Sequence, residues 1–591
     1  MKIKEALPLR LTPVQTILLA SVFLTFADNW RLFQQLAARV DLVSVKGLHL
    51  LLLVVTLMVS LFGLVFVSLG HRRLLKPLLV AVFIGTAVLS YFTSSFGIVF
   101  DREMIRNIHE NMMDRNTQEA GELFSLSLVT HVFLFGIVPA TLLSLVSINF
   151  KPIRQELRSR AICLGCLVGA LATLVLVNFK TVSFFARENK DLRSYANPFY
   201  AIDSTQKYIR RELRSRAEEK FTVIGADATR RKTSKTRLVG IMVVGETARA
   251  DHFSLDGYPR ITNPLLAKRD VINFKRVTSS GTATAYSVPA MFSLLAPRDY
   301  SPEKAKKQSN LLDVIAKAGV KVIWIDNNSS SKNVADRVEY VSLRSNPDPA
   351  SPLYSDGGYF DEELVRTMER TITESSGDLL IVLHTMGSHG PTYHKRFPKS
   401  FAKFTPYCEE AAPQNCNDEE VINAYDNTIL YTDYILDMIV GYLDAHGADY
   451  DSFMLYASDH GESLGENGVY LHGLPNLIAP EAQRHVPMIL WMSTGCRVNN
   501  GIVYAALRSQ EETPLSHTNI PHSLLGLFEV LTTAYNPACD IINAGRGVAT
   551  GLLKRTDARI FADRSTNMLS ALRVEHALSR SQGDPRISPG Q

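Results

Sequence analysis

The sequence predicts a two-part protein: an N-terminal bundle of five transmembrane helices, followed by an α/β domain with a mainly parallel sheet. The chain of 591 residues is longer than one hydrophobic core usually supports. Apolar residues concentrate in the first third of the chain. From about residue 238 onward, short β-branched runs alternate with longer helical patterns, which is typical of an α/β domain.

Five apolar stretches approach the roughly 20 residues that a helix needs to cross a membrane. They lie near residues 12–27, 47–70, 77–100, 123–149 and 161–179, so residues 1–180 are predicted to form the transmembrane domain. The first stretch is short and contains Gln15, Ser21 and Thr25, which is also typical of a cleaved signal peptide. No small-residue cleavage pattern follows it, and we interpret it as a span.

The distribution of Lys and Arg predicts a cytoplasmic N-terminus. In that orientation the inside segments hold ten basic residues in short stretches, and the outside loops hold six in longer ones. Five spans then place everything after about residue 180 outside the cytoplasm. Cys408 and Cys416 flank a short polar loop, which suits a disulfide in an oxidising compartment such as the periplasm. The small net charge of +5 indicates no nucleic-acid partner.

A charged connector, residues 181–236, follows the spans and contains helical-looking stretches. We expect it to lie along the membrane surface, with a solvated linker as the alternative. The α/β domain is expected over residues 237–556. Its buried strands are predicted at five apolar runs, namely Leu238–Val244, Val320–Ile325, Leu379–His384, Phe453–Ala457 and Met488–Trp491.

Polar residues follow four of these runs, where ligands gather at the carboxyl ends of parallel strands. They are Gly245-Glu246-Thr247, Asp326-Asn327-Asn328, Gly387-Ser388-His389 and Ser458-Asp459-His460-Gly461-Glu462. Glu246, Asp459 and His460 together supply two oxygens and one nitrogen, a ligand set that suits zinc. His389 and His472 are candidates for a second metal position or for holding a phosphate.

A nucleophile is predicted in the hydroxyl-rich loop that runs from residue 278 into an apolar helical pattern. A hydroxyl at a helix N-terminus faces free amides that attract a phosphate, and an adjacent zinc favours the alkoxide. Without the metal ligands, a capping Ser/Thr cluster would be the preferred interpretation. Composition leaves five candidates open, which are Thr278, Ser280, Thr282, Thr284 and Ser287.

Five segments resemble those of the lipid A phosphoethanolamine transferases, a family that includes the mobile colistin resistance enzymes and belongs to the alkaline phosphatase and sulfatase superfamily. The segments are Val-Val-Gly-Glu-Thr-Ala-Arg-Ala-Asp-His at 243–252, Gly-Thr-Ala-Thr-Ala-Tyr-Ser-Val-Pro at 281–289, Asp-Asn-Asn-Ser at 326–329, Met-Gly-Ser-His-Gly-Pro-Thr-Tyr at 386–393 and Ser-Asp-His-Gly-Glu-Ser at 458–463. The resemblance extends from the spans to about residue 555. It implies a periplasmic domain of the alkaline phosphatase and sulfatase type.

Carried over position by position, the resemblance implies that Thr284 is the nucleophile and also a zinc ligand, with Glu246, Asp459 and His460 as the other ligands. It implies one or two zinc ions, with His389 and His472 binding the second zinc or the substrate phosphate. It also implies that Glu462 contacts the residues around the metal rather than the metal itself. The substrate-contacting residues that it implies are Asn107, Glu119, Asn328 and Lys332.

The implied reaction transfers phosphoethanolamine from phosphatidylethanolamine to lipid A or inner-core lipopolysaccharide, through a covalent phosphothreonine at the inner membrane. The alternative is a related metal-dependent phosphotransferase or phosphodiesterase that acts on another periplasmic glycan or a glycerophosphate acceptor. The Cys/Ser-x-Pro-x-Arg context that sulfatases need is absent from residues 278–292. A non-catalytic membrane scaffold would have a degraded metal-ligand set, and here the set is intact.

Two departures from the family stand out. Its members commonly have cysteines on both sides of the nucleophile loop, whereas this chain has Ser280 and Ala290. The loop therefore lacks a disulfide that would hold it, and Cys408 with Cys416 is the pair that matches. Residues 557–591 are polar and contain two prolines, so we expect a disordered tail there.

Overall fold

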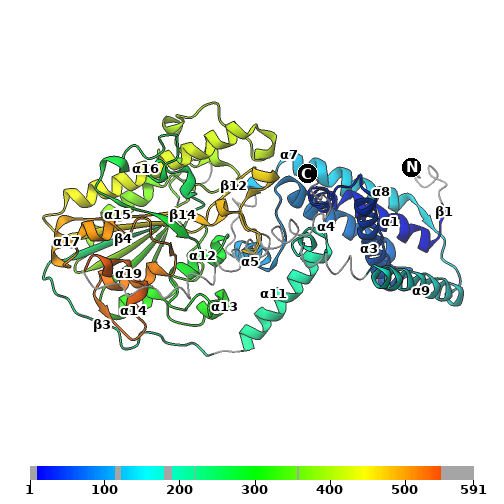
Figure 1. The fold of residues 1–591 in the computed structure, drawn as a ribbon, viewed down its shortest axis with the longest axis horizontal. Coiled ribbons are helices and arrows are strands. Elements are labelled where there is room, and N and C mark those ends of the chain that lie inside the picture. The colour runs from blue at the N-terminus through cyan, green and yellow to red at the C-terminus, as the bar shows by residue number, and fades with distance from the viewer. Residues whose placement is uncertain are drawn as a thin grey trace, which may run out of the picture.

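The computed structural model describes residues 10–113, 121–178, 185, 189–217, 220–345, 347–355 and 358–546. We call residues 10–178 the helical bundle and residues 220–546 the sheet domain. The two parts lie side by side (Figure 1). Helix α5 (Arg102–Met113) of the bundle and the connecting helix α11 (Phe199–Ala217) lie where the two parts meet. The predicted tail and Glu119 fall outside the described residues.

Four helices in the described part of the bundle are long and apolar enough to cross a membrane. They are α3 (Val45–Leu69), α4 (Leu75–Ser95), the stretch Leu126–Leu145 and the stretch Ile153–Leu174 of α9 (Ile153–Val177). The third is built from α7 (Leu126–Val132), a π-helical turn (Phe133–Ile137) and α8 (Val138–Leu145). Two-residue strands, β1 (Arg10–Leu11) and β2 (Ser147–Ile148), pair in parallel beside them.

The first predicted span forms α1 (Pro13–Ala27), which is apolar but has 15 residues. The Thr12 side chain accepts a hydrogen bond from the Gln15 backbone N–H, and Pro13 occupies the first turn, so the helix begins sharply. It ends before Asp28, and α2 (Trp30–Ala37) follows directly. Because α1 is shorter than a typical span, the expected count of five spans is not confirmed.

The sheet domain contains an eight-stranded sheet whose centre is formed by the predicted runs. The strand order is β15 (Leu515–Ser516), β5 (Ile272–Thr278), β14 (His485–Met492), β11 (Asp451–Ser458), β4 (Leu238–Gly245), β10 (Leu379–His384), β6 (Lys321–Asp326) and β7 (Glu339–Ser342). All five predicted runs are strands, and β5, β7 and β15 were not predicted.

The prediction of a mainly parallel sheet needs correction, because the sheet is mixed. β14 pairs antiparallel with both β11 and β5, while the other neighbouring pairs are parallel. Residues 459–484 connect β11 to β14 without a crossover helix. A connection of this kind returns the chain to the adjacent position in the opposite direction, whereas parallel neighbours need a crossover.

Helices cover both faces of the sheet (Figure 1). Met242 and Val244 of β4 pack with α12 (Thr284–Met291), α14 (Leu311–Lys317) and α19 (Asn519–Leu527) in one buried cluster. Ile241 and Val243 pack with α15 (Glu362–Glu374) and α16 (Asp418–Ala445) in another. Every residue of β4 is buried, as expected of a strand with two covered faces.

Shorter elements complete the sheet domain. They include β3 (Thr229–Arg230) with β16 (Val530–Leu531), β8 (Tyr354–Ser355) with β9 (Gly358–Tyr359), β12 (Ser463–Leu464) with β13 (Tyr470–Leu471), and the helices α13 (Pro302–Ala305), α17 (Thr494–Asn499) and α18 (Tyr504–Arg508). Cys408 and Cys416 form the predicted disulfide, with Cα atoms 5.9 Å apart.

Candidate active site

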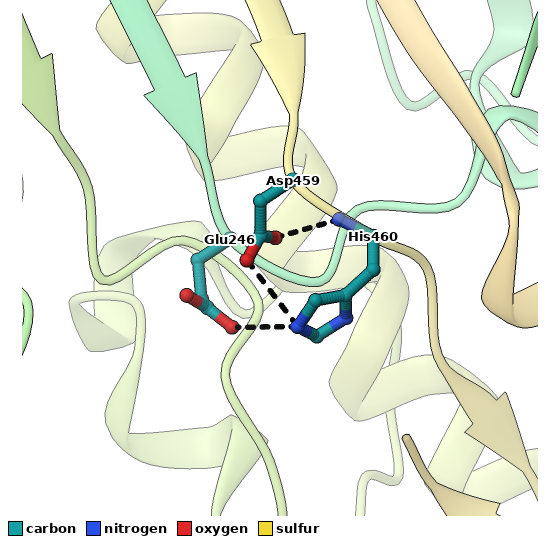
Figure 2. A group of neighbouring side chains, drawn as sticks. All are labelled: Glu246, Asp459 and His460. Atoms are coloured by element: carbon teal, nitrogen blue, oxygen red, sulfur yellow. Dashed lines mark hydrogen bonds and ion pairs between the residues drawn. The ribbon is translucent and has the colours of Figure 1, made fainter. Parts of the chain in front are cut away.

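Three side chains that could hold a metal ion meet at the carboxyl ends of β4 and β11. The strands are parallel neighbours and Gly245 pairs with Ser458, so the residues that follow them emerge side by side. Figure 2 shows Glu246, Asp459 and His460 converging there, with one ligand atom of each within 4.8 Å of the others. His460 Nε2 lies 3.3 Å from Asp459 Oδ2 and 3.6 Å from Glu246 Oε1. All three side chains are buried.

The surrounding backbone leaves two of these groups ready to bind a cation. Asp459 Oδ1 accepts the N–H groups of Thr247 and His460, while the buried Oδ2 has no hydrogen-bond partner among the described residues. His460 Nδ1 lies 3.0 Å from the Gly461 carbonyl, so Nδ1 donates and Nε2 keeps its lone pair. Burial lowers the pKa of His460 to about 4, which keeps the ring neutral. The donor set and the orphan oxygen fit a zinc ion.

Thr284 is the hydroxyl residue that the fold brings to this group. It is the first residue of α12, and its Oγ1 lies 3.2 Å from Glu246 Oε2 and 3.2 Å from His460 Nε2. By contrast, Thr282 Oγ1 donates to the Leu474 carbonyl at 2.6 Å. Of the five hydroxyl candidates in the loop, Thr284 alone has a described contact with the metal-binding side chains. The N–H groups at the start of α12 favour a phosphate beside it.

Asn328 and Lys332 lie along one side of the site. Asn328 Nδ2 donates to Glu246 Oε2 at 2.8 Å and to the Thr385 carbonyl at 3.0 Å. The buried Lys332 Nζ donates to Ser329 Oγ at 2.9 Å and to Asn111 Oδ1 at 3.3 Å. Asn111 belongs to α5, four residues after Asn107, so the helical bundle reaches the predicted substrate side of the site.

The two predicted histidines, His389 and His472, lie close to His460. The ring centres of His460 and His472 are 4.3 Å apart, and those of His389 and His472 are 5.9 Å apart. Glu462 accepts from Tyr393 OH at 2.8 Å, and its other oxygen lies 2.7 Å from His472 Nδ1. Glu462 therefore orients His472. Burial, reinforced by Arg396, lowers the pKa of His389 well below its usual value, which keeps this ring neutral.

Gly387 allows the loop after β10 to press against Glu246. Its φ is +51°, and a Cβ atom there would lie 2.8 Å from the Glu246 carbonyl oxygen. We expect Gly387→Ala to destabilise the fold by about 1–3 kcal/mol and to lower catalytic turnover by roughly 100-fold through displacement of Glu246. Gly377→Ala is the matched control, because Gly377 also has positive φ but nothing within 4 Å of its Cβ position. Thermal unfolding and turnover measured on both variants test this expectation, and equal turnover in the two would contradict it.

His517 is a residue of the site that the sequence did not reveal. It is fully buried, its Nδ1 accepts the Ser280 N–H at 3.1 Å, and its Nε2 donates to the Ser458 carbonyl at 2.9 Å. It therefore connects the nucleophile loop to the strand that ends at the metal-binding residues. The loop that lacks a disulfide is held by a histidine instead. A lone His in the turn between β15 and α19 carries no signal of this role, because both of its partners are distant in sequence.

Two substitutions separate the two contacts of His517. In His517→Asn the side-chain oxygen can replace Nδ1, whereas in His517→Gln the amide can replace Nε2. We expect His517→Gln to lower turnover roughly 10- to 100-fold at unchanged zinc content, because only the nucleophile loop loses its anchor. His517→Asn is expected to weaken zinc retention instead. Turnover and metal analysis of the purified variants distinguish these outcomes, and identical behaviour of the two would rule the separation out.

Comparisons with known proteins place these features in context. A family model described as phosphoethanolamine transferase EptA/EptB matches residues 58–213, and one described as sulfatase matches residues 239–530. Phosphoethanolamine transferase EptA of Salmonella typhimurium is 39% identical over 541 residues, which cover 90% of this chain and 96% of that protein. Phosphatidylethanolamine transferase Mcr-1 of Escherichia coli is 39% identical over 539 residues, with 88% and 95% covered.

A solved structure is similar over both parts of the molecule. The integral membrane protein lipooligosaccharide phosphoethanolamine transferase A of Neisseria meningitidis superposes with a TM-score of 0.85 at 29% sequence identity. The match covers 91% of this chain and 100% of that one. The similarity therefore includes the helical bundle and the sheet domain together.

Proposed function

The chain belongs to the EptA/EptB family of phosphoethanolamine transferases, and we propose that it transfers phosphoethanolamine from phosphatidylethanolamine to lipid A or inner-core lipopolysaccharide. One observation carries the proposal at the level of residues. The Thr284 hydroxyl lies 3.2 Å from Glu246 and from His460, at the N-terminus of α12. This arrangement suits a nucleophile that attacks phosphorus.

Glu246, Asp459, His460 and Thr284 are the residues that would hold a zinc ion. When bound, zinc lowers the pKa of a coordinated hydroxyl and withdraws charge from phosphoryl oxygens. The neutral His460 ring and the Asp459 Oδ2 atom, which accepts no hydrogen bond from the described residues, support this assignment. A second zinc at His389 and His472 is the alternative to direct phosphate binding by these two side chains.

In the first half of the proposed reaction, Thr284 Oγ1 bonds to the phosphorus of phosphatidylethanolamine. The bond between phosphorus and the glycerol oxygen breaks, and diacylglycerol leaves with a proton. The Lys332 ammonium and the Asn328 amide lie on the same side of the site and suit the phosphoryl oxygens. Asn107 is assigned to the substrate from α5, and Glu119 keeps this role as a proposal from the sequence alone.

In the second half, an oxygen of the acceptor bonds to the phosphorus of the phosphothreonine. The bond to Thr284 Oγ1 breaks, and the threonine hydroxyl regains its proton. His472, oriented by Glu462, faces His460 at the metal site and suits the leaving or entering oxygen. We propose that the protein lies in the bacterial inner membrane, with five spans including α1 and with the connector 181–236 at the membrane surface. The sheet domain then lies in the periplasm.

Attachment of the site to the membrane explains why one chain combines a helical bundle with a sheet domain. Donor and acceptor are both lipids, so a site attached to the bilayer meets them on a surface rather than in three dimensions. Confinement of this kind lowers the entropic cost of bringing reactants together.

Mass spectrometry of lipid A and core oligosaccharide, prepared separately from a host with and without the protein, tests the proposal. We expect phosphoethanolamine on one of the two fractions only when the protein is present, and the modified fragment identifies the acceptor. Release of diacylglycerol with no modification of either fraction would favour a phosphodiesterase or another acceptor, and would contradict the proposed transfer.

A further inference from the structure

Two loops that carry site histidines are held in place by side chains of the helical bundle. We propose that docking of the bundle onto the sheet domain positions His389 and His472, with Glu122 and Arg31 as the positioning residues. This inference rests on the proposed function for the role of the two histidines. It means that the phosphate-handling side of the site is complete only when the two parts of the chain are docked.

The first connection runs through Arg396 of the sheet domain. Its Nε donates to the His389 carbonyl at 2.7 Å, and its Nη2 donates to Thr392 Oγ1 at 3.1 Å and also pairs with the Glu122 carboxylate of the bundle. The side chains of Arg396 and Glu122 are only 4% and 5% exposed. A buried arginine needs a partner for its charge, so Glu122 fixes the guanidinium and, through it, the backbone of His389.

The second connection runs through Arg31 of α2. Its Nη2 donates to the carbonyls of Asn467 and Gly468, each at 3.0 Å, at the turn between β12 and β13. The next strand, β13, is also bound to the bundle, because the Tyr470 N–H donates to the Phe96 carbonyl at 2.8 Å. β13 ends at Leu471, directly before His472, so this hairpin sets the position of the second histidine.

The nucleophile and two of the metal-binding residues have different supports. Asp459 is oriented by backbone N–H groups of Thr247 and His460, and His460 by the Gly461 carbonyl. Thr284 contacts Glu246 and His460. All these partners belong to the sheet domain. Loss of the bundle contacts is therefore expected to disturb His389 and His472 without disturbing zinc at Glu246, Asp459 and His460.

The test measures binding of O-phosphoethanolamine, a soluble form of the headgroup, to the full-length, zinc-loaded protein by isothermal titration calorimetry. We expect Glu122→Gln to weaken binding about 10-fold at unchanged zinc content. Arg396→Lys should weaken it similarly, because lysine can pair with Glu122 but loses the fixed Nε contact with His389. Asp378→Asn is the control: it removes a carboxylate from the Arg230–Asp378 ion pair, whose side chains are 10% and 8% exposed and which contacts neither the site nor the bundle.

Wild-type affinity in Glu122→Gln, or equal weakening in Asp378→Asn, would overturn the inference. Arg31→Gln provides an independent check, since it acts through the β12–β13 hairpin and should also weaken headgroup binding. Failure of the proposed function is separately visible. If the wild type binds O-phosphoethanolamine but modifies no glycolipid, transfer is refuted while the positioning role stands. If transfer occurs and Glu122→Gln binds normally, only the positioning role is refuted.

Discussion

Replacing Thr284 with alanine is expected to lower phosphoethanolamine transfer by roughly 10,000-fold or more, because the oxygen that bonds to phosphorus is removed. The fold should survive, since Thr284 begins α12 and its side chain does not cap the helix. Thr284→Ser keeps a hydroxyl at the same place and is expected to retain more activity than the alanine variant. The measurement is diacylglycerol release from phosphatidylethanolamine by purified full-length protein.

Thr282→Ala provides the control in the same loop. Thr282 Oγ1 donates to the Leu474 carbonyl and has no described contact with the metal-binding side chains. We expect it to cost about 1 kcal/mol of stability and to keep most of the activity. Intact-mass spectrometry without acceptor adds a direct reading: a phosphoethanolamine adduct should form on the wild type and not on Thr284→Ala. An adduct of equal yield on the alanine variant would place the nucleophile elsewhere.

Asp459→Asn is expected to abolish both zinc retention and transfer. Asn can still accept the Thr247 and His460 N–H groups through its oxygen, but it presents an amide nitrogen where Oδ2 now lies, and this nitrogen has no lone pair for a metal. The substitution also removes one of two neighbouring buried carboxylates. The metal-free variant should therefore unfold at a temperature equal to or above that of the metal-free wild type.

The distinguishing measurement is the change in unfolding temperature on adding zinc. A ligand that binds only the folded state stabilises it according to its concentration and affinity, so the wild type should gain stability and Asp459→Asn should not. Asp433→Asn is the control, because burial raises the pKa of Asp433 to about 7 and its carboxylate lies on α16, where it accepts the Leu265 and Leu266 N–H groups. If zinc raised the unfolding temperature of Asp459→Asn, Asp459 would be excluded as a zinc ligand.

Much of the fold could be predicted because its signals are local. A buried strand such as β4 is apolar at every position, and the polar residues that follow it mark the carboxyl end of the strand. β7 is largely exposed and β5 mixes buried and exposed positions, so neither stands out as an apolar run. The direction of β14 could not be predicted either, since the same apolar run is expected whether a strand pairs parallel or antiparallel.

The candidate site could also be predicted only in part from the sequence. Composition left five hydroxyl candidates open, and a resemblance to relatives was needed to select Thr284. The structure brings Thr284 next to Glu246 and His460, which are 38 and 176 residues away along the chain. No sequence periodicity connects positions so far apart.

The sequence by itself determined the two-part organisation, the central strands and the residue types of the candidate metal site. Each of these depends on a short stretch of neighbouring residues, either an apolar run or the polar residues that follow a strand. Only the tertiary structure decided which side chains hold the site together. His517 bridges the Ser280 and Ser458 backbones, and Glu122 reaches His389 through Arg396. These contacts join segments that are distant in sequence, and an isolated charge or imidazole acquires its role only when folding buries it beside a partner.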